Sequence, residues 1–212
     1  GRVSYLHISP AYANNSFGTS TKRKALEEQF MKATGIVRRI DDLGRIVVPK
    51  EIRRTLRIRE GDPLEIFTSR EGEIMLKKYS PIGEMGEIAG NCAEALAQAA
   101  EALVCITDRD YIVAASGSGR KELEGEHISP QVEALMEKRG TFVVNHVHEE
   151  LPLVTKEWTG DHKGAALSAI ICNGDCQASV IVVTQSDNPQ KLETIRILAQ
   201  SAAGFIGKHM EQ

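Results

Sequence analysis

The sequence contains the run Gly35-Ile-Val-Arg-Arg-Ile-Asp-Asp-Leu-Gly-Arg-Ile-Val-Val-Pro-Lys-Glu-Ile-Arg-Arg-Thr-Leu56, which combines a hairpin pattern with a dense set of arginines. Residues 35–40 and 45–48 are rich in β-branched side chains and flank the turn-forming residues 41–44, which predicts two antiparallel strands. Pro49 then suits the first position of a short helix that ends near Leu56. This run therefore predicts a strand–turn–strand–helix unit.

Two more strands are predicted at 64–68 and 74–78, joined by a turn at 70–72. About fifty residues of this kind bury too little apolar surface to be stable alone. The predicted strands nevertheless carry many aliphatic side chains, namely Ile36, Val37, Ile40, Ile46, Val47, Val48, Leu64, Ile66, Ile74 and Leu76. We therefore expect two copies to share one core, so that folding and dimerisation are the same event.

The charge of the chain is unevenly distributed. Residues 31–59 hold nine Lys and Arg against three acids, whereas residues 81–212 hold ten Lys and Arg against nineteen acids. A basic segment beside a long acidic one indicates two domains with different partners, and the basic segment is the candidate anion-binding part. A two-fold dimer would present its arginines symmetrically, as symmetric half-sites in double-stranded DNA require.

The pattern from Met31 to Ile58, continued by Gly61-Asp-Pro-Leu-Glu-Ile66 and Leu76-Lys-Lys-Tyr79, resembles the AbrB family of swapped-hairpin DNA-binding domains. The resemblance implies an interleaved homodimer that binds DNA through arginines on the hairpin and the adjoining helix. By position these are Arg38, Arg45, Arg53 and Arg54, and Arg39 stands where a basic residue is also usual. Arginine pairs bidentately with phosphate and with guanine edges, which suits this role.

Residues 31–212 together resemble sporulation regulators that carry this module ahead of a GAF-like domain. The looser C-terminal match includes Asp108-Arg-Asp110, Ser116-Gly-Ser118 and Ala202-Ala-Gly-Phe205. The resemblance implies bacterial cytoplasmic localisation, in the forespore, and a GAF-like domain that oligomerises or senses an unknown small molecule. GAF folds bind many unrelated molecules or none, so no particular cofactor is expected.

The C-terminal part alternates helices with strands. Helix starts are predicted where a capping residue precedes proline, at Ser80-Pro81, Ser129-Pro130 and Asn188-Pro189. Apolar runs predict strands at 103–106, 111–115, 141–147, 165–172 and 178–184, with a hairpin turn at 173–175.

Two heptad-like stripes accompany the first and last of these helices. One comprises Ile82, Met85, Ala89, Cys92, Leu96, Ala99 and Leu103; the other comprises Leu192, Ile195, Ala199, Ala202 and Ile206. The stripes fit either a face packed on its own domain or an intermolecular helix bundle that would make a tetramer. Both readings stay open from the sequence.

Other chemistry is weakly supported. His146 and His148 with Cys172 and Cys176 could form a zinc site or a redox pair, but nothing in the sequence brings them together, so no metal and no catalytic residue is expected. Gly117-Ser-Gly-Arg-Lys121 lacks the spacing of a nucleotide-binding fingerprint and is interpreted as a turn. Trp158 suits either a core or a pocket wall.

Composition limits the remaining alternatives. No run of 18 apolar residues occurs and four cysteines form no disulfide framework, so we expect no membrane span and a reduced, cytosolic setting. An antitoxin is the alternative function, since antitoxins also use swapped-hairpin domains, although they follow them with a short disordered tail. An enzyme would need an activated nucleophile, and no such pattern occurs.

The predicted fold is α+β, with an N-terminal intertwined swapped-hairpin β-barrel dimer followed by a GAF-like α/β domain with flanking helices. The predicted divisions are 31–80 for the DNA-binding domain, 81–102 for a linker helix and 103–212 for the GAF-like domain. Residues 1–30 are rich in Ser, Thr, Asn and Gly and are interpreted as extraneous or disordered, or else as a basic arm through Lys22, Arg23 and Lys24.

Overall fold

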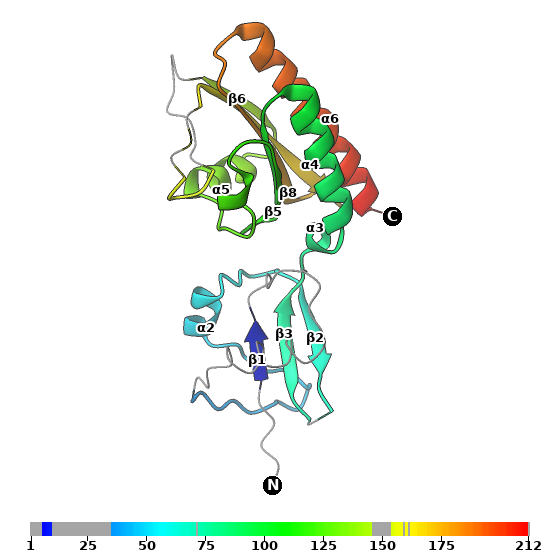
Figure 1. Ribbon diagram of the computed structural model, residues 1–212. Helices are drawn as coiled ribbons and strands as arrows, with labels where there is room; N and C mark the ends of the chain where they lie inside the picture. The colour runs from blue at the N-terminus through cyan, green and yellow to red at the C-terminus, as the bar shows by residue number, and fades with distance from the viewer. Residues whose placement is uncertain are drawn as a thin grey trace. The chain divides into compact units, whose positions relative to one another are not determined.

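The computed structural model describes residues 6–9, 35–70, 72–145, 154–158, 160 and 162–211. The chain divides between Tyr79 and Ser80 into two compact units (Figure 1). Within the described residues, no helix is both long and apolar enough to cross a membrane.

The first unit contains a three-stranded sheet and one short helix. Its elements are β1 (Leu6–Ser9), α2 (Lys50–Thr55), β2 (Leu64–Thr68) and β3 (Ile74–Lys78), and the strand order is β1-β3-β2. β2 and β3 are antiparallel with Ile66 opposite Leu76, and β1 lies parallel to β3. The last two strands have the predicted bounds, and α2 begins one residue after Pro49, which is its N-cap. Of residues 1–30, only β1 is described, so the interpretation of that segment stays a prediction.

The strands predicted at 35–40 and 45–48 are wrong for the single chain, because these residues form no regular strand. Their turn is present: the Gly44 N–H donates to the Asp41 carbonyl (3.0 Å), and the Asp41 N–H donates to the Arg45 carbonyl (3.1 Å). An extended segment forms a β-strand only when its backbone N–H and C=O groups pair with those of a neighbouring strand. The two arms leave the turn without such a ladder within the described chain.

The second unit is a five-stranded antiparallel sheet with helices on both faces. Its helices are α3 (Pro81–Glu84), α4 (Gly86–Ala100), the 3₁₀ helix η1 (Arg120–Glu122), α5 (Pro130–Glu137) and α6 (Pro189–Met210). Its strands are β4 (Leu103–Thr107), β5 (Ile112–Ser116), β6 (Thr141–Asn145), β7 (Gly164–Cys172) and β8 (Asp175–Thr184), in the order β5-β4-β8-β7-β6. The predicted α+β content is confirmed.

Successive residues of the central strands enter two different cores. Val104 and Val182 pack with α4 and α6 on one face, whereas Cys105 and Ile181 pack with α5 and Leu123 on the other. In Figure 1, α4 and α6 accordingly lie side by side along one face of this sheet, and α5 covers the other. Strands covered on both faces have continuous apolar sequences, which is why β4 and β8 do not alternate with polar residues.

All three proline-associated helix starts are confirmed. The side chains of Ser80, Ser129 and Asn188 accept hydrogen bonds from backbone N–H groups in the first turns of α3, α5 and α6. The predicted hairpin turn between β7 and β8 is also present, with φ of 50° at Asn173 and 83° at Gly174. Capping residues and turn residues determine the backbone conformation through contacts within a few residues of chain. This is why these helix starts and this turn could be predicted from the sequence.

The stripe on the last helix packs inside its own domain rather than on another chain. Ile195, Ala199 and Ile206 are fully buried, and Leu192 and Ala202 nearly so. A side chain on Gly207 would meet the Ile171 carbonyl, so this glycine lets α6 lie close against β7. Of the two readings that the sequence left open, packing on its own domain is therefore supported for this stripe, because the sheet already covers it.

The first stripe and the continuous linker helix need a correction. The helix is interrupted at Met85, whose ψ of 25° lies off the helical value, between Gly83 and Gly86. Glycine has low helix propensity, which permits the break. The buried face of α4 comprises Ala89, Ala93, Ala97 and Ala100, whereas Ala99 of the predicted stripe is exposed and Leu103 belongs to β4.

Candidate nucleic-acid interface

The hairpin places three predicted arginines at or beside its turn. Arg38 and Arg39 lie on the arm before the turn, and Arg45 is the first residue after it; all three are exposed. Arg45 is tethered at one end: its Nε donates to Asp41 Oδ2 over 2.7 Å, with 70% of its own side chain exposed. The guanidinium thus lies at the protein surface in a defined place.

The short helix α2 supplies the other two arginines. Arg53 and Arg54 lie in its last turn and are exposed, as is Lys50 at its start. Ile52 and Leu56 are half-buried, which matches the face predicted from their spacing. The helix therefore presents its basic residues to solvent while one apolar face points toward the rest of the unit.

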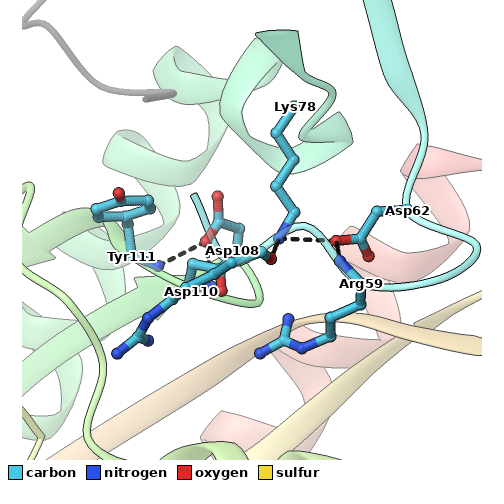
Figure 2. Close-up of polar contacts among 7 residues, drawn as sticks. Arg59, Asp62, Lys78, Asp108, Asp110 and Tyr111 are labelled. Atoms are coloured by element: carbon cyan, nitrogen blue, oxygen red, sulfur yellow. Dashed lines mark hydrogen bonds and ion pairs between the residues drawn. The ribbon is translucent and has the colours of Figure 1, made fainter. Parts of the chain in front are cut away.

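An internal ion pair fixes the loop that follows this helix. Lys78 on β3 lies 3.0 Å from Asp62, with 16% and 2% of the two side chains exposed. Its Nζ also donates to the Arg57 carbonyl, and Asp62 Oδ2 accepts from the Arg59 backbone N–H (Figure 2). A buried pair satisfied by further hydrogen bonds holds geometry firmly.

Sequence reasoning missed this support, because Asp62 and Lys78 are sixteen residues apart and each was interpreted only as part of a loop or a strand. The available signal was the Gly61-Asp62-Pro63 turn, since a turn aspartate commonly accepts nearby backbone N–H groups. The pair connects the end of α2 to β3 and so helps to place the basic helix.

The structure brings the five predicted arginines into one hairpin-and-helix unit, and Asp41 is the acid that contacts one of them. The Arg45 backbone N–H, followed by its guanidinium, lowers the pKa of Asp41 below its ordinary value. Asp41 is therefore ionised at neutral pH. Within the part of the chain that the structure describes, no acid contacts the other four arginines, which leaves them accessible to an anionic partner.

The weaker candidate sites of the second unit do not assemble. Burial raises the pKa of both Cys172 and Cys176, which disfavours the thiolate that redox or metal chemistry needs. The described residues contain no group of three potential metal ligands. His146 and His148 lie outside the described residues.

Two other features of that unit have structural explanations. Gly117 to Lys121 forms the turn into η1, as expected. Trp158 is buried in the core on the α5 face and stacks on His162 with ring centroids 4.9 Å apart. The core interpretation of this tryptophan is therefore supported.

Comparison with known proteins places the chain in a family. Stage V sporulation protein T of Bacillus subtilis (strain 168) is 46% identical over 191 residues, which cover 86% of this chain and all of the relative. The family described as "Stage V sporulation protein T C-terminal, transcription factor" matches residues 84–211. The chain belongs to the stage V sporulation protein T family.

The N-terminal unit has separate relatives. The transition state regulatory protein AbrB of the same organism is 62% identical over 52 residues, covering 24% of this chain and 53% of AbrB. The family described as "Antidote-toxin recognition MazE, bacterial antitoxin" matches residues 37–84. The resemblance of this unit to the AbrB family is confirmed.

Similar solved structures include the N-domain of the transcription factor abrB, at 62% identity and a TM-score of 0.23, which covers 24% of this chain and 98% of that one. The PixJ GAF domain of Thermosynechococcus elongatus is similar at 10% identity and a TM-score of 0.44, covering 63% of this chain and 89% of that one. At these scores the structural likeness carries no argument about what either unit binds.

Proposed function

We propose that this chain is a sequence-specific DNA-binding transcription regulator of sporulation, acting in the bacterial cytoplasm on forespore genes. Arg38, Arg39, Arg45, Arg53 and Arg54 form its DNA-binding surface. The observation that carries the proposal is that all five arginines are exposed within one hairpin-and-helix unit. Among the described residues, the acid that pairs with one of them is Asp41, which contacts Arg45. Membership of a family described as a transcription factor supports the same function.

The binding unit is a dimer. Within the described residues, the first unit contributes no side chain to either hydrophobic core, and eight of its large apolar side chains are exposed: Ile36, Val37, Ile40, Leu43, Val47, Ile66, Phe67 and Tyr79. Exposure of this many large apolar side chains is unfavourable in water. A second copy covers these side chains and completes the ladders that the hairpin arms lack, which produces the intertwined barrel expected from the resemblance.

The second unit joins dimers into a tetramer and offers a place for regulation by a small molecule. Its helix α6 exposes Ile197 and Phe205, two turns apart on one face, with 48% and 58% of these residues accessible. In the proposed tetramer this face is buried against another copy in a helix bundle. The bundle would use these two residues rather than those of the predicted stripe.

The DNA surface is tested by binding of the full chain to a duplex selected by the unmodified protein from a random-sequence pool. Arg45→Ala and Arg53→Ala each lower the affinity by about 1–3 kcal/mol if they make bidentate base contacts. With ~6 phosphate contacts, log affinity falls with log salt at a slope of about −5. Arg120→Ala, an exposed arginine of the second unit, is the matched control.

Affinity retained within about twofold in both arginine variants, with normal dimers, would place the DNA surface elsewhere. Such a result, with the control also unchanged, would leave the fold intact and reject the assignment of the hairpin-and-helix surface.

An antitoxin is the second candidate, because the MazE antitoxin family matches residues 37–84. The folded second unit argues against it, since residues 80–211 enclose two hydrophobic cores rather than forming a short tail. An antitoxin would relieve growth arrest caused by expression of an adjacent reading frame. A regulator would leave that arrest unchanged.

A further inference from the structure

Asp41 is the centre of the hydrogen bonds that shape the hairpin turn. Its Oδ1 accepts from the backbone N–H groups of Leu43 (3.0 Å) and Arg45 (2.7 Å), and its Oδ2 accepts from Arg45 Nε (2.7 Å). The Asp41 backbone also accepts a hydrogen bond from the Gly44 N–H and donates one to the Arg45 carbonyl. One carboxylate thus fixes both the backbone and the side chain of Arg45.

The contact leaves the outer end of the guanidinium available. It uses Arg45 Nε, while the two Nη groups form the planar fork that pairs with phosphate or with the O6 and N7 atoms of guanine. The Arg45 side chain is 70% exposed and that of Asp41 is 36% exposed. An ion pair this exposed contributes little to stability. Its effect lies in the orientation of Arg45.

We propose that Asp41 is a positioning residue for DNA recognition, which holds the Arg45 fork outward in the conformation that reads a base edge. The inference rests on the DNA-binding function proposed above. It makes an unusual prediction about charge. An acid beside a polyanion ordinarily weakens binding, so its removal should strengthen binding. Here removal weakens sequence-specific binding, because Arg45 loses its fixed orientation and must be ordered when DNA binds.

The chain offers a matched control in the neighbouring residue. Asp42 is an exposed residue of the same type and makes no hydrogen bond or ion pair within the described residues. Asp42→Asn therefore reports the effect of charge alone. Asp41→Asn keeps an oxygen that can accept the two backbone N–H groups, so that the turn is retained while the ion pair is removed.

The experiment measures binding of the full chain to the selected duplex and to a scrambled duplex of the same composition. Asp41→Asn lowers the affinity for the selected duplex by about tenfold and leaves the affinity for the scrambled duplex unchanged or higher. Asp42→Asn lowers neither affinity. In an Arg45→Ala background, Asp41→Asn has no further effect, because there is no fork left to position.

A turn defect would instead lower both affinities and the thermal transition of the dimer. Should Asp41→Asn fail to form dimers, Asp41→Ser replaces it, since serine also accepts turn N–H groups and provides no partner for the guanidinium. Equal behaviour of the Asp41 and Asp42 variants, in stable dimers, overturns the inference and leaves the proposed function standing. Unchanged binding by Arg45→Ala overturns the role of Arg45, and this inference with it.

Discussion

The two units use the same kinds of apolar residue in opposite ways. Val180 and Ile195 of the second unit are completely buried, whereas Val37 and Val47 of the first are 86% and 74% exposed. Aliphatic side chains stabilise a fold only when they leave water. The second unit therefore encloses its own core, whereas the first unit would acquire one only in the proposed dimer.

The two units also differ in the sign of their charge. The first unit gathers exposed arginines on a small scaffold, while the second is acidic over residues 81–212. The proposed dimer would couple DNA binding to assembly, because the arginines would reach a symmetric arrangement only when two chains meet. The experiments below either break this contrast between the units or sharpen it.

The largest effect is expected from a charge placed on the exposed apolar arms. Val37→Asp and Val47→Asp should dissociate the DNA-binding dimer, since each aliphatic group is worth about 1.5–3 kcal/mol on burial and occurs twice per dimer. Sedimentation velocity across a dilution series measures the loss. Ile171→Asp, which replaces an exposed isoleucine of the second unit, is the control and should leave the dimer intact.

If both arm variants behaved like the control, these side chains would be ordinary surface residues. The contrast between the units would then be broken, because the first unit would be stable as a single copy despite its exposed apolar groups.

A buried residue of the second unit should behave in the opposite manner. Ile195 on α6 is fully buried against the sheet, so Ile195→Ala should lower the free energy of unfolding by about 2–5 kcal/mol at any protein concentration. Trp158 is the single tryptophan of the chain and lies in this unit, so its fluorescence follows this transition alone. A midpoint that depended strongly on protein concentration would show that the second unit also lacks a complete core of its own.

The same contrast explains what could be predicted from the sequence. The strands at 64–68 and 74–78 were located correctly because each finds its partner within a few residues of chain. The arms around Asp41 have the same β-branched composition, yet they form no strand in the single chain. Their ladder depends on a partner that composition does not specify.

The sequence left two readings of the helix stripes open for a different physical reason. A heptad repeat identifies an apolar face but does not say what covers it. On α6 the sheet covers Ile195 and Ile206, whereas the exposed pair Ile197 and Phe205 lies on another face and has no heptad pattern. The exposure of the candidate arginines was easier to predict, since an exposed cation needs no partner to be placed, and their role in DNA binding stays a proposal. The Asp62–Lys78 pair that supports them required the fold.

A smaller effect is expected at the exposed face of α6. Ile197→Glu and Phe205→Glu should convert tetramers into dimers, because like charges would meet across the helix bundle. The unfolding of the second unit should change by about 0.5 kcal/mol or less, as for other surface sites. Light scattering at micromolar concentration measures the assembly. Were the unmodified protein a dimer at that concentration, α6 would have no role in assembly.

The last effect depends on pH and concerns a buried acid in the turn between β4 and β5. Asp108 is 7% exposed, and its Oδ1 accepts from the backbone N–H groups of Asp110 (2.7 Å) and Tyr111 (2.6 Å). Burial is the main cause that raises the pKa of Asp108 above its ordinary value, and the charge of Asp110 adds to it; the two backbone hydrogen bonds and the Ser80 hydroxyl lower the pKa by less. The contact with Tyr111 is drawn in Figure 2.

A raised pKa means that the folded state holds the proton more tightly than the unfolded state does. The protonated group therefore favours folding below its unfolded pKa, and this contribution is lost as the pH rises through the folded pKa. Asp108→Asn keeps an oxygen for the two N–H groups and carries no charge. It should raise the free energy of unfolding at pH 7 by about 1.4 kcal/mol for each unit of pKa elevation. The gain should shrink as the pH is lowered toward 4 in urea titrations followed by Trp158 fluorescence, because both side chains are then neutral.

Asp108→Ala is the control, and it should destabilise the unit at every pH by leaving two N–H groups without their acceptor. If Asp108→Asn were also destabilising at pH 7, the ionised carboxylate would be stabilising the turn, and its hydrogen bonds would outweigh the cost of burial.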